Sequence, residues 1–167
     1  MPTINDIIKL LNLQPLPTEG GLFVETYRSN EAVQKAALAG RYTSDRAFAS
    51  AIYYLLAPDT FSHMHSLKSD EIFHFYLGDP VTMLQLHPDG NSEIITLGQN
   101  IEKGERLQVI VPHGTWQGAR LIDGGGFALM GTTVAPAYDP DDFELGQRDD
   151  LIRQFPDNAN LIRQLTA

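Results

Sequence analysis

Apolar residues in the middle of the chain recur in short runs, and turn-forming residues separate each run from the next. Runs of this length that are rich in β-branched and aromatic residues predict β-strands. Roughly eight to ten such strands follow one another, with helical patterns only at the two ends, so the predicted fold class is an all-β antiparallel sandwich or barrel. The expected strands lie at 48–56, 61–65, 71–77, 81–87, 92–97, 106–111, 115–122 and 126–134.

The two ends of the chain show helical periodicity instead. Residues 3–13 place isoleucine and leucine side chains on one stripe, and Thr3 and Asp6 have the spacing of a capping box. Near the other end, residues 149–155 and 157–165 predict two short helices. We expect these two helices to cover a sheet edge or a subunit contact.

Two stretches after the first helix are less regular. Residues 19–29, EGGLFVETYRS, combine a glycine pair that permits a bend with residues of high strand propensity. Within this stretch we expect Glu25 and Arg28 to form a surface ion pair. Residues 30–46 are polar and alanine-rich, and their pattern fits a loop, a frayed helical turn or a flap.

Three of the five histidines lie in the segment 61–78, FSHMHSLKSDEIFHFYLG. Because alternate side chains of a strand share a face, His63 and His65 are expected side by side, roughly 7 Å apart. Glu71 lies in the next strand, so two imidazoles and a carboxylate converge if these strands are neighbours. Such a group can hold a divalent metal or act as a metal-free acid–base cluster. The same residues could also be ordinary solvated side chains.

Composition restricts the classes of function. A chain of 167 residues is expected to form one domain with a sizeable core. Acidic residues exceed basic ones by 21 to 12, which argues against nucleic acid and anionic membranes as partners. The absence of cysteine excludes disulfides, thiolate metal sites and cysteine nucleophiles. Neither a signal-peptide pattern nor a membrane-spanning apolar run is present, so we expect a cytoplasmic location.

Two motifs in this order resemble the two-part signature of the cupin superfamily. The resemblance implies an RmlC-like jelly roll, the cupin double-stranded β-helix, as a single domain over 1–167 with its barrel core at about 48–134. The segments EGGLFVETYRS, LKSDEIFHFYLGDP, VPHGTWQGARL and DFELGQRDDL are similar to a small cupin branch classed as a domain of unknown function, which implies a homodimer. The motif residues are His63, His65, Glu71 and Gly78, then Gly104, Pro112, Gly114 and Gln117.

The chain departs from the family pattern at two places. Five residues, 66–70, stand between the second histidine and Glu71, more than the family usually has, and the spacing to the following glycine assigns the carboxylate role to Glu71. Gln117 stands where the family usually supplies a third histidine. The resemblance therefore implies either a divalent metal such as Zn, Mn, Fe or Ni, or a metal-free polar floor. In both cases the residues are His63, His65, Glu71 and Gln117.

The resemblance also implies a small polar ligand inside the barrel. One hypothesis is an isomerase or epimerase acting on a sugar or sugar nucleotide, with His63 or His65 as base and Glu71 orienting it. A second is a non-catalytic cupin that binds a sugar, a nucleotide or an organic acid, and a third is a metal-dependent dioxygenase. The candidate pocket lining is Gln117 with Trp116, Tyr54, Phe73 and Phe75, although each aromatic could equally belong to the core.

Overall fold

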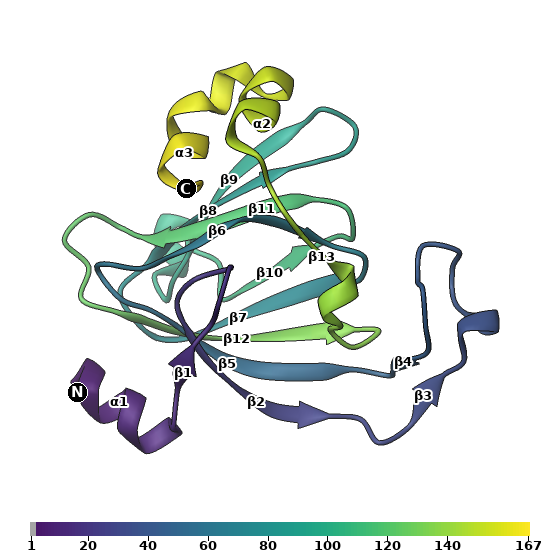
Figure 1. Ribbon diagram of the computed structural model, residues 1–167. Helices are drawn as coiled ribbons and strands as arrows, with labels where there is room; N and C mark the ends of the chain where they lie inside the picture. The colour runs from purple at the N-terminus through teal and green to yellow at the C-terminus, as the bar shows by residue number, and fades with distance from the viewer. Residues whose placement is uncertain (1–2) are drawn as a thin grey trace.

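The structure, a computed structural model that describes residues 3–167, is built around two antiparallel sheets that pack face to face (Figure 1). This arrangement confirms the predicted all-β jelly roll. The larger sheet has the order β1 (Gln14–Pro15), β2 (Leu22–Arg28), β5 (Ser50–Leu56), β12 (Ala128–Ala135), β7 (Asp70–Gly78) and β10 (Gln108–Val111). The smaller has the order β13 (Phe143–Leu145), β6 (Phe61–Leu67), β11 (Trp116–Leu121), β8 (Val81–Leu86) and β9 (Ser92–Leu97).

The main hydrophobic core lies between the two sheets, because alternate residues of each strand point inward. Strand β7 shows the rule clearly: Glu71, Phe73 and Phe75 are buried, and the residues between them are more exposed. The opposite wall comes from the smaller sheet, where Met83 and Leu97 are fully buried. The same alternation therefore places one carboxylate, Glu71, on the inner face among apolar neighbours.

Helix α1 (Ile4–Leu11) packs against the outer face of the larger sheet. Thr3 accepts a hydrogen bond from the backbone of Asp6, and the Asp6 side chain accepts from the backbone of Thr3, so the predicted capping box is present. Ile7 is buried against Leu55 and other apolar residues of the sheet. The N-terminal periodicity thus predicted both the helix and the side that it buries.

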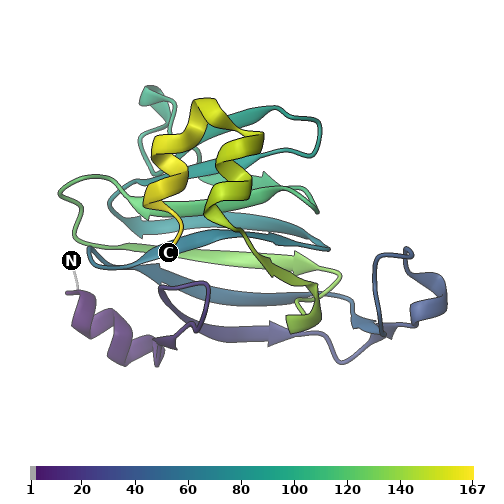
Figure 2. The same cartoon turned by 45° about the horizontal axis from the view of Figure 1, so that its top comes forward.

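The C-terminal helices α2 (Arg148–Gln154) and α3 (Ala159–Gln164) lie across the outer face of the smaller sheet (Figure 2). Leu151 and Ile162 pack there against Met64. The expectation for these helices is a sheet edge or a subunit contact. The helices mainly cover the outer face of the smaller sheet, a second apolar face that must also be buried, and a subunit contact stays a prediction. Within residues 3–167, none of the helices is long and apolar enough to cross a membrane.

Residues 30–46 form an arm that extends away from the barrel (Figure 1). It contains the two-stranded ladder of β3 (Ala32–Val33) and β4 (Arg46–Ala47), joined through the 3-10 helix η1 (Lys35–Ala37). Elsewhere in the described residues, three further 3-10 helices connect the strands and helices, namely η2 (Ile101–Lys103), η3 (Pro140–Asp142) and η4 (Pro156–Asn158).

The base of the arm is fixed by a buried ion pair. The Nε and Nη2 atoms of Arg46 donate to the two carboxylate oxygens of Asp142 at 2.8 and 2.7 Å. This two-point geometry joins the start of β4 to the segment that follows the last long strand.

Candidate functional site

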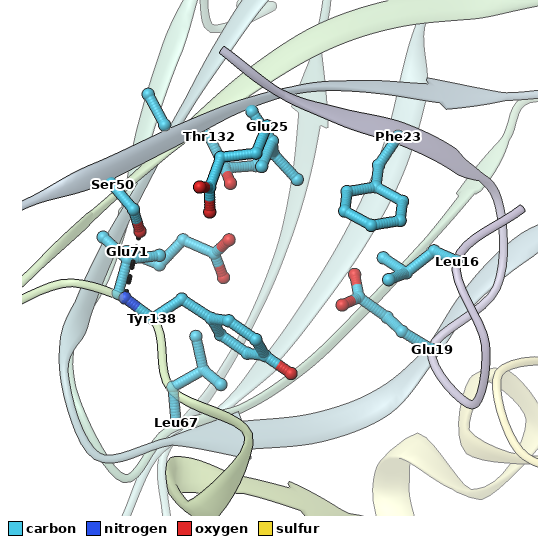
Figure 3. A pocket seen from close by; sticks show the side chains of 12 residues that line it. Leu16, Glu19, Phe23, Glu25, Ser50, Leu67, Glu71, Thr132 and Tyr138 are labelled. Atoms are coloured by element: carbon cyan, nitrogen blue, oxygen red, sulfur yellow. Dashed lines mark hydrogen bonds between the residues drawn. The ribbon is translucent and has the colours of Figure 1, made fainter. Parts of the chain in front are cut away.

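A cavity of about 60 Å³ opens between the two sheets, and its walls combine apolar side chains with three carboxylates (Figure 3). Most of the lining comes from the inner face of the larger sheet. A loop before β2 and the segment after β12 close its sides. The lining residues are Leu16, Glu19, Phe23, Glu25, Ser50, Ala51, Ile52, Leu67, Glu71, Thr132, Val134 and Tyr138.

Glu71 is connected to a buried polar chain on the smaller sheet. The amide nitrogen of Gln117 donates to the Glu71 carboxylate at 2.5 Å and lies 3.3 Å from Nε2 of His65. The Nδ1 atom of His65 lies 2.7 Å from the backbone oxygen of His63, which fixes the Nδ1-protonated tautomer. The structure therefore brings together three of the four residues that the cupin motifs indicate.

His63 does not join this group, because a β-bulge interrupts strand β6. His65 pairs with Gln117 and Ser62 pairs with Ala119, so β6 has one more residue than β11 over this stretch. The expectation that His63 and His65 share one face is therefore wrong. The His63 ring lies beside Phe61, at 4.4 Å between ring centres.

A glycine on the neighbouring strand makes room for the bulge. A Cβ atom at Gly118 would lie 2.7 Å from the sulfur of Met64 and 3.0 Å from the backbone oxygen of Ser62. Glycine within a strand marks such close approaches. This glycine is the sequence signal that could have indicated the bulge.

Sequence reasoning missed Glu19, which supplies a second carboxylate that is mostly buried, with 16% of its side chain exposed. The loop that carries Glu19 lies beside strand β6 of the smaller sheet. There the Ser62 hydroxyl donates to the Glu19 carboxylate at 3.2 Å. His63 holds the loop at two points. Its backbone N–H donates to the backbone oxygen of Glu19 at 2.8 Å, and its Nδ1 lies 2.9 Å from the backbone oxygen of Thr18. His63 is thus placed to position Glu19.

The glycine pair after Glu19 lets the loop approach the sheet. Gly20 has a φ of +97°, and a Cβ atom there would lie 2.2 Å from the Phe61 oxygen. Gly21 has a φ of +73° and leaves similarly little space beside Tyr54. Because only glycine adopts these angles without strain and without a clash, the pair is a signal for a close approach that carries Glu19 into the barrel.

Burial without a basic partner changes the acid–base properties of the site. Removal from water raises the pKa of Glu19 to about 7. Burial likewise raises the pKa of Glu71 to about 7, and the charge of Glu19 adds to the rise. Burial also raises the pKa of the Tyr138 phenol and lowers that of His65, so that both stay neutral near pH 7. Because the charge of Glu19 raises the pKa of Glu71, the protonation of one carboxyl group depends on that of the other.

The ion pair predicted near the N-terminus is present at the mouth of the cavity. Arg28 donates to Glu25 through Nε and Nη2, with a shortest distance of 2.8 Å, and its Nη1 donates to the backbone oxygen of Tyr138 at 3.1 Å. Glu25 is therefore neutralised by a basic neighbour. Within residues 3–167, no basic side chain lines the cavity beside Glu19 and Glu71.

The four aromatic residues predicted to bind a ligand do not line this cavity. Phe73 and Phe75 lie in the core between the sheets. Tyr54 also belongs to that core, and its hydroxyl donates to the Gly20 oxygen at 3.0 Å, so it supports the Glu19 loop. Trp116 packs on the outside of the smaller sheet, below the C-terminal helices. Their roles in ligand binding stay predictions.

The residues do not fit the metal site that the cupin motifs indicate. The bulge directs His63 to the Glu19 loop, and the Gln117 amide turns its hydrogens, not its oxygen, toward Glu71 and His65. Within residues 3–167 no group of three or more His, Cys, Asp or Glu side chains is placed to hold an ion. What the site does contain is a pair of carboxyl groups that can give and accept a proton near neutral pH.

Comparison with known proteins supports the architecture. The sequence model of the family described as Cupin superfamily (DUF985) matches residues 5–146. The chain is similar to the uncharacterized yeast protein YML079W of Saccharomyces cerevisiae, with 27% identity over 145 residues, which is 82% of this chain and 72% of the yeast protein.

Two solved structures match almost the whole chain. Protein SO0799 from Shewanella oneidensis is 32% identical with a TM-score of 0.87, over 100% of this chain and 99% of that one. A hypothetical protein from Leishmania major is 30% identical with a TM-score of 0.88, over 99% of both chains. Oxalate decarboxylase of Bacillus subtilis, at 14% identity and a TM-score of 0.54 over 92% of this chain and 37% of that one, shares the fold alone.

Proposed function

Because this chain belongs to the cupin superfamily, in its DUF985 family, we propose that the barrel cavity is a proton-transfer site that isomerises or epimerises a small hydroxylated carbonyl compound, such as a sugar. The observation that carries the proposal is geometric. Glu19 and Glu71 reach the same cavity from different elements, one from the loop before β2 and the other from β7 (Figure 3). Glu71 is buried and Glu19 is mostly buried, and the histidine beside them, His65, whose Nε2 lies 4.0 Å from Glu19, is kept neutral by burial that lowers its pKa.

An epimerisation needs two groups that work in sequence. One carboxylate removes a proton from the carbon next to the substrate carbonyl, which breaks the C–H bond and leaves an enolate. The other carboxyl group, still protonated, then donates a proton to the opposite face of that carbon. Because both pKa values are raised to about 7, the pair supplies one acid and one base at neutral pH.

The enolate oxygen also needs a hydrogen-bond donor. The Tyr138 hydroxyl lies at the cavity, and its raised pKa keeps it protonated and able to donate. Gln117 and His65 lie behind Glu71, so we assign them the role of orienting that carboxyl group. In this scheme Glu71 is a base or acid itself, and no step passes through a metal.

The test is exchange of substrate C–H hydrogen with D₂O. A panel of aldoses, ketoses and their 2-amino counterparts is incubated with the protein, and deuterium uptake is followed by NMR. We expect uptake in at least one sugar, and a decrease of about 10² to 10⁴-fold in Glu19→Gln and in Glu71→Gln. Binding of a sugar without any exchange would instead support the non-catalytic binding protein.

The homodimer stays a proposal, with the outer face of the larger sheet as its interface. Ile110 points outward from β10 and is 58% exposed, and Tyr76 is 42% exposed on the same face. The arm 30–46 adds mostly exposed side chains beyond the barrel. A second copy would bury this surface, so we expect a dimer by light scattering and a monomer for Ile110→Asp. A monomeric wild type would contradict the proposal.

A further inference from the structure

The charges around the cavity are unbalanced. Every ionisable carboxyl group in the lining is a glutamate, and one of the three, Glu25, is paired with Arg28. Glu19 and Glu71 face the cavity, and the histidine beside them, His65, has its Nε2 4.0 Å from the Glu19 carboxylate. Burial lowers the pKa of His65, so this ring is neutral near pH 7 and supplies no positive charge. Buried charges in proteins are usually paired, because an isolated buried charge loses its hydration. Among the residues that the structure describes, the cavity beside Glu19 and Glu71 therefore lacks a positively charged group that would neutralise them.

The basic groups nearest to the cavity are already engaged. Arg28 uses its guanidinium on Glu25 and on the backbone oxygen of Tyr138. His65 has Nδ1 on a backbone oxygen and Nε2 toward the Gln117 amide, and this unprotonated Nε2 also lies 4.0 Å from the Glu19 carboxylate. Arg46 is bound to Asp142 at the base of the arm. The protein itself thus supplies no free cation for the two carboxyl groups within residues 3–167.

We propose that the ligand carries the missing charge as a protonated amine, which binds between Glu19 and Glu71. This inference rests on the proposed function and narrows its substrate to an amine-bearing hydroxylated compound, such as an amino sugar. An ammonium group donates a charge-assisted hydrogen bond to the ionised carboxylate and a second hydrogen bond to the carbonyl oxygen of the protonated carboxyl group, so the pair keeps one acid and one base. Phosphates and carboxylates would meet like charge in a poorly hydrated site, which disfavours sugar nucleotides and organic acids.

The dimensions of the site indicate how such a ligand fits. A cavity of about 60 Å³ has room for about two water molecules, so it holds an aminoethanol-sized part of a ligand. A shallower groove shares Leu16, Glu19 and Tyr138 with the cavity and continues outward to Pro140 and Phe143. The amine would occupy the deep part, and the rest of the ligand would follow this groove.

The experiment compares three small probes of similar size and different charge: 2-aminoethanol, ethylene glycol and glycolate. Each is titrated into the full chain and followed by protein NMR. We expect 2-aminoethanol to bind at least about tenfold more tightly than ethylene glycol, since hydrogen bonds between charged groups are about twice as strong as neutral ones. Glycolate should not bind. Equal affinity for ethylene glycol, or binding of glycolate, would overturn the inference.

Variants locate the effect. Glu19→Gln and Glu71→Gln should each remove the preference for 2-aminoethanol, whereas Glu93→Gln should retain it, because Glu93 lies on β9 and pairs with Arg106. A preference that survives both cavity variants would place the amine elsewhere and overturn the inference. The comparison of probes on the wild type decides the question even if a variant fails to fold.

The two proposals can fail separately. A preference for amines without deuterium exchange in any sugar would leave the amine site standing and remove the isomerase. Deuterium exchange in neutral sugars, with no preference for amines, would do the reverse. D-Glucosamine and D-glucose form the matched pair for this comparison: the isomerase proposal requires exchange in at least one sugar, and the amine inference adds that exchange is faster for D-glucosamine.

Discussion

Two pairs of charged residues are withdrawn from water in this protein, and they differ in what surrounds them. The side chains of Arg46 and Asp142 are 1% and 2% exposed, and each satisfies the other through two hydrogen bonds. Glu71 is also buried, and Glu19 is mostly buried with 16% of its side chain exposed, yet both are acids and face a cavity. Arg46 and Asp142 neutralise each other, and we call them the closed pair. Glu19 and Glu71 have the same charge, so a proton or a positively charged group must neutralise them, and we call them the open pair.

The difference separates a structural role from a chemical one. An ion pair of this kind fixes the positions of two segments, and its charges are already neutralised, so it offers no charged group to a substrate. A pair of buried acids lowers stability at neutral pH, and such a cost is typical of a site that is organised for binding or catalysis.

Breaking the closed pair should have the largest effect. Arg46→Ala leaves Asp142 buried, with Lys68 at 3.6 Å as its remaining basic neighbour. We expect the free energy of unfolding to fall by about 3 to 5 kcal/mol in urea denaturation, the range seen when one partner of a buried pair is removed. Arg106→Ala, which breaks an exposed pair with Glu93, should cost less than about 1 kcal/mol. Similar losses in the two variants would remove the contrast.

Neutralising the open pair should raise stability, with a defined pH dependence. The folded-state pKa of Glu71 is raised from 4.5 to about 7, so the native protein holds more protons than the unfolded chain between these values. The free energy of unfolding therefore falls as pH rises from about 4.5 to about 7. At pH 8 we expect the free energy of unfolding of Glu71→Gln, measured by urea denaturation, to exceed that of the wild type by on the order of 1 to 3 kcal/mol. At pH 4 the two free energies should be equal. A gain of equal size at both pH values would contradict this assignment.

Loosening the loop that carries Glu19 should have a smaller effect on stability. His63→Ala removes the side-chain contact with the Thr18 oxygen, and we expect a loss of about 1 kcal/mol. Amide hydrogen exchange should become faster in residues 16–21 while the barrel strands stay protected. His63→Asn, which can still donate to this oxygen, should restore slow exchange. Unchanged exchange in His63→Ala would show that the loop is held by other contacts.

A divalent metal ion could also neutralise the open pair. The metal content of the purified protein is the quantity for which we expect the smallest value and the smallest change on mutation. Of the four residues that the motifs indicate, His63 points away and Gln117 turns its amide hydrogens toward the other two. Untagged protein purified without chelator should therefore contain far less than one metal ion per chain by elemental mass spectrometry. His65→Ala should contain no less. Near-stoichiometric metal that disappears in His65→Ala would show that these residues rearrange into a metal site.

Periodicity was enough to predict the elements whose neighbours are local. The capping box of α1 and the inward position of Glu71 follow from spacing alone. The family resemblance added Gln117, which indeed contacts Glu71. These features depend on one strand or one helix, or on a pairing that the jelly roll imposes, and for that reason the sequence contains them.

The missed features depend on contacts between distant segments. Strict alternation predicted His63 beside His65, but one extra residue in β6 reversed the side to which His63 points. Glu19 reaches the barrel only because Gly20 and Gly21 let its loop approach β6 and β5. Alternation cannot reveal either event, since a bulge and a loop crossing are set by the partner strand. The glycines at these places were the available signals.

The site draws its walls from both ends of the chain: Glu19 comes from a loop ahead of the main strands, and Tyr138 follows the last of them. During synthesis on the ribosome, Glu19 emerges early and its cavity does not yet exist. The cavity is complete only after Tyr138 has left the exit tunnel and β12 has inserted between β5 and β7. The two carboxyl groups therefore come to face one cavity only after the barrel has closed, so the proposed site exists only in folded molecules.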